Sequence, residues 1–272
     1  MKKLLSFGIG LMLSANLLAQ VPGVLAKSYI VMDLDGSVIL EHDAKTVRPI
    51  ASITKLLVAE QISKEIAPDD LVTIEKADIV SRSSIIKIHS KIQESELLQL
   101  ALISSSNQAI YALARVHDEP KIVSAVNDAA RARGLNTIYI EEPSGLNQNN
   151  RASAEDLAKF LRMVDGTPIA QVSTEPTAKI LNSSIHSTNP LLGKPGWNFS
   201  VSKTGFINAS GGCIATIVEI GGKPRAVVIL GSSNTTTRWI DLMLIRTYIA
   251  SSDIFWKNSS KVKHEHHHHH HR

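Results

Sequence analysis

Cysteine is almost absent from this chain, and no internal repeat or low-complexity linker divides it. Cys213 is the single cysteine among 272 residues, so no disulfide can form within the chain. Its neighbours from Gly212 to Ile217 are mostly apolar, which favours a buried strand position over use as a nucleophile. The length is sufficient for one large domain with a sizeable core.

An excess of charge is also missing from the body of the chain. The formal net charge is +4, but six of the 29 basic residues lie in residues 1–3 and 257–272, where only one of the 25 acidic residues lies. The remaining charges almost balance. A nucleic-acid partner therefore has no electrostatic support.

The chain lacks an apolar run long enough to span a bilayer. Basic Met1–Lys3 is followed by an apolar run from Leu4 to Leu13, whereas a spanning helix needs about 20 residues. This pattern is typical of a secretory signal peptide over residues 1–19, with cleavage after Ala19 or, as a second candidate, Ala26. An uncleaved membrane anchor is the alternative; after cleavage we expect no integral membrane span.

The histidines of the body lack the spacing of metal ligands. His89, His117 and His186 are scattered, so we expect no metal and no cofactor. Residues 251–272 end in a run of histidines, which is either an expression tag or a natural metal-scavenging tail. We expect these residues to form a flexible tail and exclude them from the fold.

The two ends of the body have strand patterns and its middle has helical ones. Two β-rich runs around Asp35-Gly36 predict a hairpin, and a second hairpin is predicted around Gly221-Gly222. Helices are predicted at residues 50–67, 96–103, 109–116, 120–133, 153–164 and 235–250, with short β-leaning runs at 71–74 and 85–88 and a strand at 198–203. Together they predict one α/β (α+β) domain over residues 27–250. Its antiparallel sheet is built from both chain ends, with helices packed on it.

The helix after Pro49 carries a serine and a lysine that project from one face. Ser52 and Lys55 lie three residues apart, one helical turn from each other. Apolar neighbours from Leu56 to Ala59 indicate that the helix is buried, and burial lowers the pKa of a lysine so that it can act as a base. The pair favours a serine nucleophile activated by lysine, although a capping serine beside a solvated lysine has the same spacing.

Two further motifs offer polar groups where the local pattern is otherwise apolar. Ser105 and Asn107 lie in an interruption between two apolar helices and present a hydroxyl and an amide, or alternatively only a helix cap. Lys203-Thr204-Gly205 ends a strand-like run. Its glycine permits close approach of another chain segment, and its lysine and threonine can hold a carboxylate, although a solvated lysine is the alternative.

In this order, Ser52-x-x-Lys55, Ser105-x-Asn107 and Lys203-Thr204-Gly205 resemble the motif set of serine β-lactamases and penicillin-binding proteins. The phrases Glu142-Pro143-Ser144-Gly145-Leu146 and Lys203-Thr204-Gly205-Phe206-Ile207-Asn208 narrow the resemblance to the low-molecular-mass D-alanyl-D-alanine peptidases. The likeness is strongest to their endopeptidase branch, the penicillin-binding protein 7 type. It covers about residues 27–250 and implies a β-lactamase/transpeptidase-like fold.

The resemblance implies acyl transfer on the D-Ala-D-Xaa bond of peptidoglycan stem peptides, specifically hydrolysis of D-Ala–diaminopimelate crosslinks in the periplasm. β-Lactam antibiotics would be covalent inhibitors. Carried over from the family, Ser52 is the nucleophile and Lys55 the general base. Ser105 and Asn107 relay protons and hold the substrate amide.

The same resemblance assigns the substrate-binding groups. Lys203, Thr204 and Gly205 would bind the terminal carboxylate of the substrate, or its counterpart on a crosslinked peptide. The backbone N–H groups of Ser52 and Phe206 would form the oxyanion hole, where losing one donor typically costs ~10²–10³ in rate.

A β-lactamase is the nearest rival enzyme. In class A enzymes two residues separate a glutamate from Leu-Asn, whereas here three residues separate Glu142 from Leu146-Asn147. In addition, Phe206 replaces a small hydroxyl residue after Gly205. A penicilloyl-enzyme without a positioned base for water should persist, which favours a penicillin-binding protein.

Two other functions are compatible with the sequence. A D-alanyl-D-alanine carboxypeptidase would trim pentapeptides, but many such enzymes carry a further β-rich domain and an amphipathic anchor, and only about 67 residues follow Gly205. A non-hydrolytic module could keep the motifs only to capture wall peptides or β-lactams. Such a module would have no need of Lys55.

Overall fold

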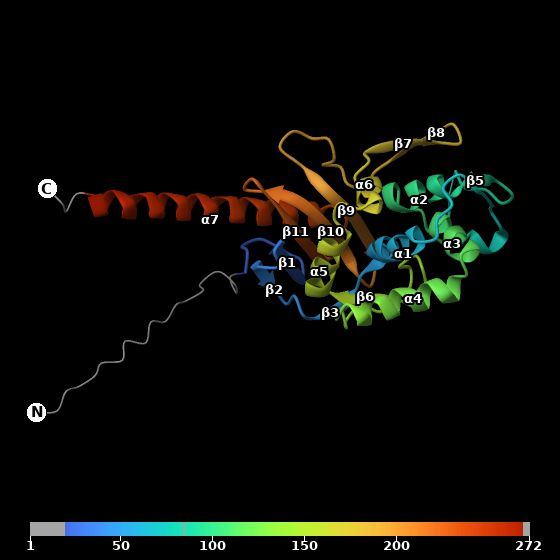
Figure 1. Ribbon diagram of the computed structural model, residues 1–272, viewed down its shortest axis with the longest axis horizontal. Helices are drawn as coiled ribbons and strands as arrows, with labels where there is room; N and C mark the ends of the chain where they lie inside the picture. Colours follow the sequence, from blue (N-terminus) through green and yellow to red (C-terminus); the bar gives the residue numbers. More distant parts are fainter. Residues whose placement is uncertain (1–19, 84, 269–272) are drawn as a thin grey trace, which may run out of the picture.

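A central antiparallel sheet of five strands joins the two ends of the chain (Figure 1). The structure is a computed structural model that describes residues 20–83 and 85–268. The strand order is β2-β1-β11-β10-β9, so the sheet is assembled from both chain ends and the predicted α/β class is confirmed. The bounds are β1 Ser28–Asp33, β2 Val38–His42, β9 Phe199–Ile207, β10 Gly211–Ile220 and β11 Lys223–Ser232.

Both predicted hairpins are present, and glycine makes each turn possible. β1 pairs with β2 through a turn in which Gly36 has a φ of 95°, and β10 pairs with β11 through Gly221 and Gly222 at 63° and 79°. These values lie in the left-handed region, which glycine adopts without steric strain.

Helices cover both faces of the sheet. The first part of α7 (Thr237–His268) packs on one face, and the helix then projects beyond the sheet, whereas α5 (Ala154–Val164) packs on the other face (Figure 1). Val227 and Val228 are neighbours on β11, point to opposite faces and are both buried. The sheet is therefore apolar on both sides, which explains the apolar run around Cys213. That residue is fully buried in β10, as predicted.

The remaining helices form a second body beside the β9 edge of the sheet (Figure 1). They are α1 Thr54–Ser63, α2 Glu94–Ile103, α3 Asn107–Val116, α4 Glu119–Ala132 and α6 Pro168–Ser173. Most lie where the sequence predicts helices, whereas α6 was not expected. α7 also continues beyond Ala250, where we expected the closing helix to end.

Three short strand pairs complete the architecture: β3 (Val47–Pro49) with β6 (Arg151–Ser153), β4 (Leu71–Thr73) with β5 (Lys91–Gln93), and β7 (Thr177–Ile180) with β8 (Ser183–His186). The prediction of strand character at 85–88 is wrong. This segment consists of bends and turns, and Ile86 is buried without being part of a strand.

The expected signal peptide lies outside the described residues. Among the residues that are described, no helix is both long and apolar enough to cross a bilayer.

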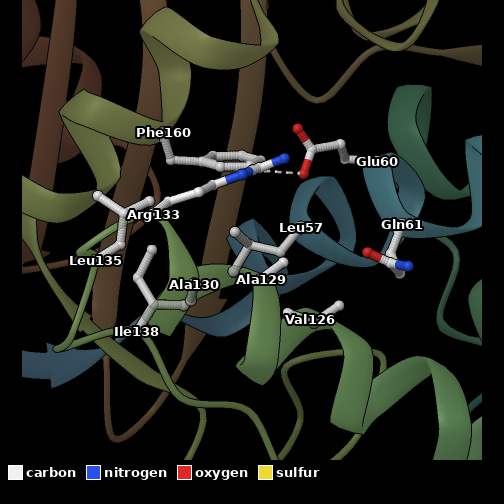
Figure 2. Close-up of a pocket in the computed structure, with 10 residues that line it drawn as sticks. All are labelled: Leu57, Glu60, Gln61, Val126, Ala129, Ala130, Arg133, Leu135, Ile138 and Phe160. Atoms are coloured by element: carbon white, nitrogen blue, oxygen red, sulfur yellow. Dashed lines mark hydrogen bonds and ion pairs between the residues drawn. The ribbon is translucent and has the colours of Figure 1, made fainter.

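Phe160 fills the contact between α1, α4 and α5 (Figure 2). It is 2% exposed. Arg133 lines the same small cavity as Phe160, and the Arg133 Nη1 donates to Glu60 Oε1 at 2.8 Å. Leu57 of α1 also lines this cavity, opposite residues of α4 such as Ala130. This packing holds α1 in place.

We predict that Phe160→Ala lowers the free energy of unfolding by about 3–5 kcal/mol, because it removes a large buried ring and leaves a cavity. Met163→Ala, on the same helix but 44% exposed, should change it by about 0.5 kcal/mol or less. Urea unfolding measures both. Equal midpoints for the two variants would contradict the packing described for Phe160.

Candidate active site

Ser52 and Lys55 meet at the junction of two helices. Ser52 lies in a short 3-10 helix, Ala51–Ile53, which precedes α1, whereas the sequence predicted one continuous helix. Ala51 has a φ of 48°, a left-handed value uncommon for a residue with a side chain. Lys55 is in the first turn of α1, and its Nζ lies 2.6 Å from Ser52 Oγ. The predicted pairing of hydroxyl and amine is therefore present in the structure.

Burial sets the charge of Lys55. The side chain is 0% exposed, and this burial lowers its pKa to about 7, against the opposing effect of the Glu142 carboxylate. Near neutral pH a substantial share of the amine is thus unprotonated. An unprotonated Nζ has a lone pair that can accept the proton of Ser52.

A loop from Glu142 to Asn147 supports the amine from behind. Lys55 Nζ donates to the Ser144 carbonyl at 3.1 Å. The Glu142 carboxylate organises this loop by accepting hydrogen bonds from the backbone N–H groups of Ser144 (2.8 Å), Gly145 (2.6 Å) and Asn147 (3.2 Å). Burial alone would raise the pKa of Glu142, but hydrogen bonds from Ser144 and others outweigh burial and lower it. Glu142 therefore acts as an anionic anchor of the loop.

Ser105 stands between two lysines. Its φ is 60°, and its Oγ lies 3.4 Å from Lys55 Nζ and accepts from Lys203 Nζ at 2.9 Å. The helix cap that the sequence allowed at this break is supplied by Ser106, whose side chain accepts from the Ala109 N–H. Because Ser106 caps α3, the Ser105 hydroxyl is left to contact the lysines.

Asn107 begins α3 and, like Ser105, lines a cavity at the site. Its Nδ2 donates to Ser81 Oγ at 3.3 Å. The loop that contains Ser81 therefore lies beside the site.

β9 carries the third motif along the edge of the sheet. Lys203 is 1% exposed, and its Nζ also donates to the Thr204 carbonyl at 2.9 Å. Burial, together with the charges of Lys55 and Arg238, lowers its pKa well below the usual lysine value. Lys203 is thus a buried amine and not a solvated strand-end lysine.

Gly205 allows β9 to touch the segment that holds Ser52. A Cβ on Gly205 would lie 2.9 Å from both the Ile50 carbonyl oxygen and the Ser52 backbone nitrogen. Only glycine fits this approach. It brings the backbone of Ser52 next to β9, where Phe206 follows. The assignment of these two N–H groups to an oxyanion hole stays a prediction.

The motifs converge on one cavity of about 260 Å³. Lys55 and Lys203 lie buried behind it and reach it through Ser52 and Ser105. The predicted residues that line the cavity are Ser52, Ser105, Asn107, Thr204, Gly205 and Phe206.

Several lining residues were not singled out from the sequence. Arg238, on α7, is 7% exposed; it donates from Nη1 to the Gly205 carbonyl at 3.0 Å, and its Nε has no partner among the described residues. Thr188 lies with its Oγ1 2.6 Å from Thr204 Oγ1, and Leu146 is an exposed apolar side chain at the rim. No local pattern marked Arg238 or Thr188, because each reaches the cavity from a segment distant in sequence, and Leu146 was noted only as part of a family phrase.

The donors around the cavity suit an anionic ligand. Arg238 brings a guanidinium group to the lining, and Thr188 and Thr204 bring hydroxyls. The amines of Lys55 and Lys203 lie behind Ser52 and Ser105, with lowered pKa values. A serine whose hydroxyl contacts a buried amine, beside cationic and hydroxyl groups that suit a carboxylate, has the parts needed for covalent acyl transfer. The fold and the site thus define a serine-type acyl-transfer centre.

Comparison with known sequences places the chain in a family. Residues 15–234 match the family described as D-alanyl-D-alanine carboxypeptidase. A relative from Escherichia coli named D-alanyl-D-alanine endopeptidase is 32% identical, over 87% of this chain and 81% of the relative. One of the same name from Pseudomonas aeruginosa is 31% identical, over 80% and 75%. The chain belongs to the D-alanyl-D-alanine carboxypeptidase family of serine peptidases, which confirms the resemblance stated from the motifs.

Solved structures agree with this fold. A D-alanyl-D-alanine carboxypeptidase from Mycobacterium tuberculosis is 25% identical with a TM-score of 0.72, over 79% of this chain and 86% of that one. Penicillin-binding protein 6B from Escherichia coli is 22% identical with a TM-score of 0.73, over 83% and 77%. The predicted β-lactamase/transpeptidase-like fold is confirmed.

We predict that acylation by a fluorescent penicillin rises with pH through about 7 and then levels off. Ser52 can transfer its proton only to unprotonated Lys55, and the lysine pKa is lowered to about 7. Below that value the rate should fall about tenfold per pH unit. Acylation rates measured from about pH 5 to 9 test this. A rate that still rises about tenfold per pH unit up to pH 9, as expected for a solvated lysine with a pKa of about 10.4, would contradict it.

We predict that Gly145→Ala slows acylation at least about tenfold, because a small misplacement at a nucleophile is costly. A Cβ at this position would lie 1.8 Å from the Ala51 carbonyl oxygen, and the φ is 92°. Gly134→Ala is the matched control: its φ is also positive, at 74°, but its Cβ would meet nothing within 4 Å. Both variants carry backbone strain of ~1–3 kcal/mol, and Gly145→Ala adds the clash with Ala51. Both melting temperatures should therefore fall, that of Gly145→Ala further, and acylation is compared at a temperature where both variants are folded. Equal acylation rates for the two would show that the Gly145 contact does not position Ser52.

Proposed function

We propose that this serine peptidase is an endopeptidase that hydrolyses D-Ala–diaminopimelate crosslinks in peptidoglycan through an acyl-enzyme on Ser52. The observation that carries the proposal is the 2.6 Å contact between Ser52 Oγ and Lys55 Nζ, with burial lowering the lysine pKa to about 7. A base with a pKa near the working pH combines a large unprotonated fraction with useful basicity.

Acylation proceeds in two stages. Lys55 takes the proton from Ser52 Oγ as this oxygen bonds to the D-Ala carbonyl carbon, and the carbonyl oxygen gains negative charge. The backbone N–H groups of Ser52 and Phe206 stabilise that charge. The C–N bond then breaks, and the proton passes from Lys55 through the Ser105 hydroxyl, 3.4 Å away, to the leaving amine.

Deacylation uses the same groups in reverse. Lys55 takes a proton from a water molecule whose oxygen attacks the ester carbonyl carbon. The bond to Ser52 Oγ breaks, and the proton returns to that oxygen. The Ser144 carbonyl holds the amine in line for both half-reactions.

The cationic side of the cavity suits the leaving group. The amino end of a diaminopimelate crosslink bears a carboxylate on the same carbon as the nitrogen, as a terminal D-Ala does. We assign its recognition to Thr204 and Arg238, which both line the cavity, with Lys203 behind them and hydrogen-bonded to Ser105. Hydrogen bonds to a charged acceptor are stronger than neutral ones. Asn107 is placed to hold the peptide amide.

The endopeptidase choice is supported by the names of the two relatives from Escherichia coli and Pseudomonas aeruginosa and of a third, from Haemophilus influenzae. Carboxypeptidase activity is the second candidate, because the matching family carries that description. Both reactions use the same acyl-enzyme and differ in the group that the leaving nitrogen carries. We further propose that the chain acts in the periplasm and that β-lactams acylate Ser52.

We expect purified protein to convert crosslinked muropeptide dimers to monomers and to trim free pentapeptides at least about tenfold more slowly. The products are separated by chromatography and identified by mass. Ser52→Ala removes the nucleophile and should abolish both dimer cleavage and penicillin labelling.

The outcomes separate the candidates. Trimming of pentapeptides with intact dimers would replace the endopeptidase by a carboxypeptidase. Penicillin labelling without turnover of either substrate would indicate a binding module. Equal labelling of the intact chain and Ser52→Ala would remove Ser52 as nucleophile. Ser106→Ala, which removes only the helix cap, controls for loss of a hydroxyl near the site.

A further inference from the structure

The segment between β8 and β9 is hydrogen-bonded both to the helical body and to the edge strand β9, which form the two sides of the active-site cleft. On the helical side, the Thr188 N–H donates to the carbonyl of Ile103, the last residue of α2, at 3.1 Å. On the sheet side, Thr188 Oγ1 lies 2.6 Å from Thr204 Oγ1. The next residue, Asn189, is buried and donates from Nδ2 to Ser202 Oγ at 3.0 Å. The position of Thr188 is thus fixed from three directions.

This contact lies at the level of the catalytic groups. Ile103 is two residues before Ser105, and Thr204 directly follows Lys203, which itself donates to Ser105. Two hydrogen-bonded connections therefore join β9 to the helical side, one from Lys203 to Ser105 and one from Thr204 through Thr188 to Ile103. Thr188 and Thr204 both line the cavity, so the second connection is within reach of a bound ligand.

The direction of the hydroxyl–hydroxyl bond decides what Thr204 can do. Each hydroxyl has one proton and can accept through its oxygen lone pairs. If Thr204 donated to Thr188, it would have no proton for a substrate carboxylate. If Thr188 donates instead, the Thr204 proton is free for the ligand, and a chain of two hydrogen bonds is stronger than its separate members.

We propose that Thr188 is a positioning residue: its hydroxyl donates to Thr204 Oγ1, so that Thr204 directs its own proton to the carboxylate of the leaving group. The main-chain bond to Ile103 holds this relay at a fixed distance from Ser105. The proposal rests on the proposed function, because it concerns recognition of the leaving-group carboxylate in that same site.

The test compares two probes that differ in one charge, benzylpenicillin and its methyl ester. Thr188→Val keeps the shape and main chain but removes the hydroxyl; Thr188→Ser keeps the hydroxyl. We expect Thr188→Val to slow acylation by benzylpenicillin about tenfold and acylation by the ester less than about threefold. Thr188→Ser should stay within about threefold of the wild type for both probes.

Thr174→Val is the matched control. It makes the same substitution outside the cavity, where the hydroxyl donates to the Gln171 carbonyl at 3.0 Å, and should leave both rates within about twofold. The proposal is overturned if Thr188→Val slows both probes equally, if it slows neither, or if Thr188→Ser is as slow as Thr188→Val. Melting temperatures measured for each variant check that the folded chain is being compared.

Failure of the endopeptidase proposal has a different signature. A wild-type chain that is acylated by both penicillins but leaves crosslinked dimers intact would reject that function, while the comparison of Thr188 variants would still decide the role of Thr188.

Discussion

Two lysines held out of water are the constraint on which the site depends. Lys55 and Lys203 are fully buried, and burial of an ammonium group is costly enough to lower its pKa. The cost falls if the amine is unprotonated and its remaining polar contacts are satisfied. The hydroxyl of Ser105 serves both amines, and backbone carbonyls of Ser144 and Thr204 accept from them. The contacts that would suit Lys55 to the proposed role of base are therefore also the contacts that allow it to be buried.

Holding these groups requires unusual backbone conformations, and the surrounding packing keeps them in place. Ala51 and Ser105 both have positive φ values, which for residues with side chains cost ~1–3 kcal/mol each. Asn150 is one support: its carbonyl accepts from the Ile50 N–H at 3.1 Å, and its Nδ2 donates to Thr54 Oγ1 at 3.1 Å. The strained Ala51 lies beside Ser52, and the hydrogen bonds that maintain its conformation come from a different segment.

Local patterns predicted the parts of this molecule that depend on neighbours in sequence. The two hairpins, most of the helices and the shared face of Ser52 and Lys55 follow from turn residues and helical spacing. The meeting of the three motifs is a long-range contact, and only their resemblance to a known family indicated it. Arg238 had no signal at all, since it is one more polar residue on an amphipathic helix. Glu142 was weighed only against a β-lactamase glutamate, whereas the structure uses it to anchor the loop behind Lys55.

The contacts of β9 with the Ser52 segment and with Ser105 also explain why the cleft has a defined width. One of its walls is the edge strand β9 and the other is helical, and no shared hydrogen-bonding ladder joins these two described walls. Their separation is set instead by a few individual contacts. Gly205 lies against Ile50 and Ser52 at one point, and Lys203 reaches Ser105 at another. The close backbone contact at Gly205 and the hydrogen bond of the buried Lys203 amine leave the two walls little freedom to slide past each other. In the proposed mechanism the substrate thus meets a nucleophile, a base and a carboxylate site whose spacing was fixed when the chain folded, so little reorganisation is needed at the moment of reaction.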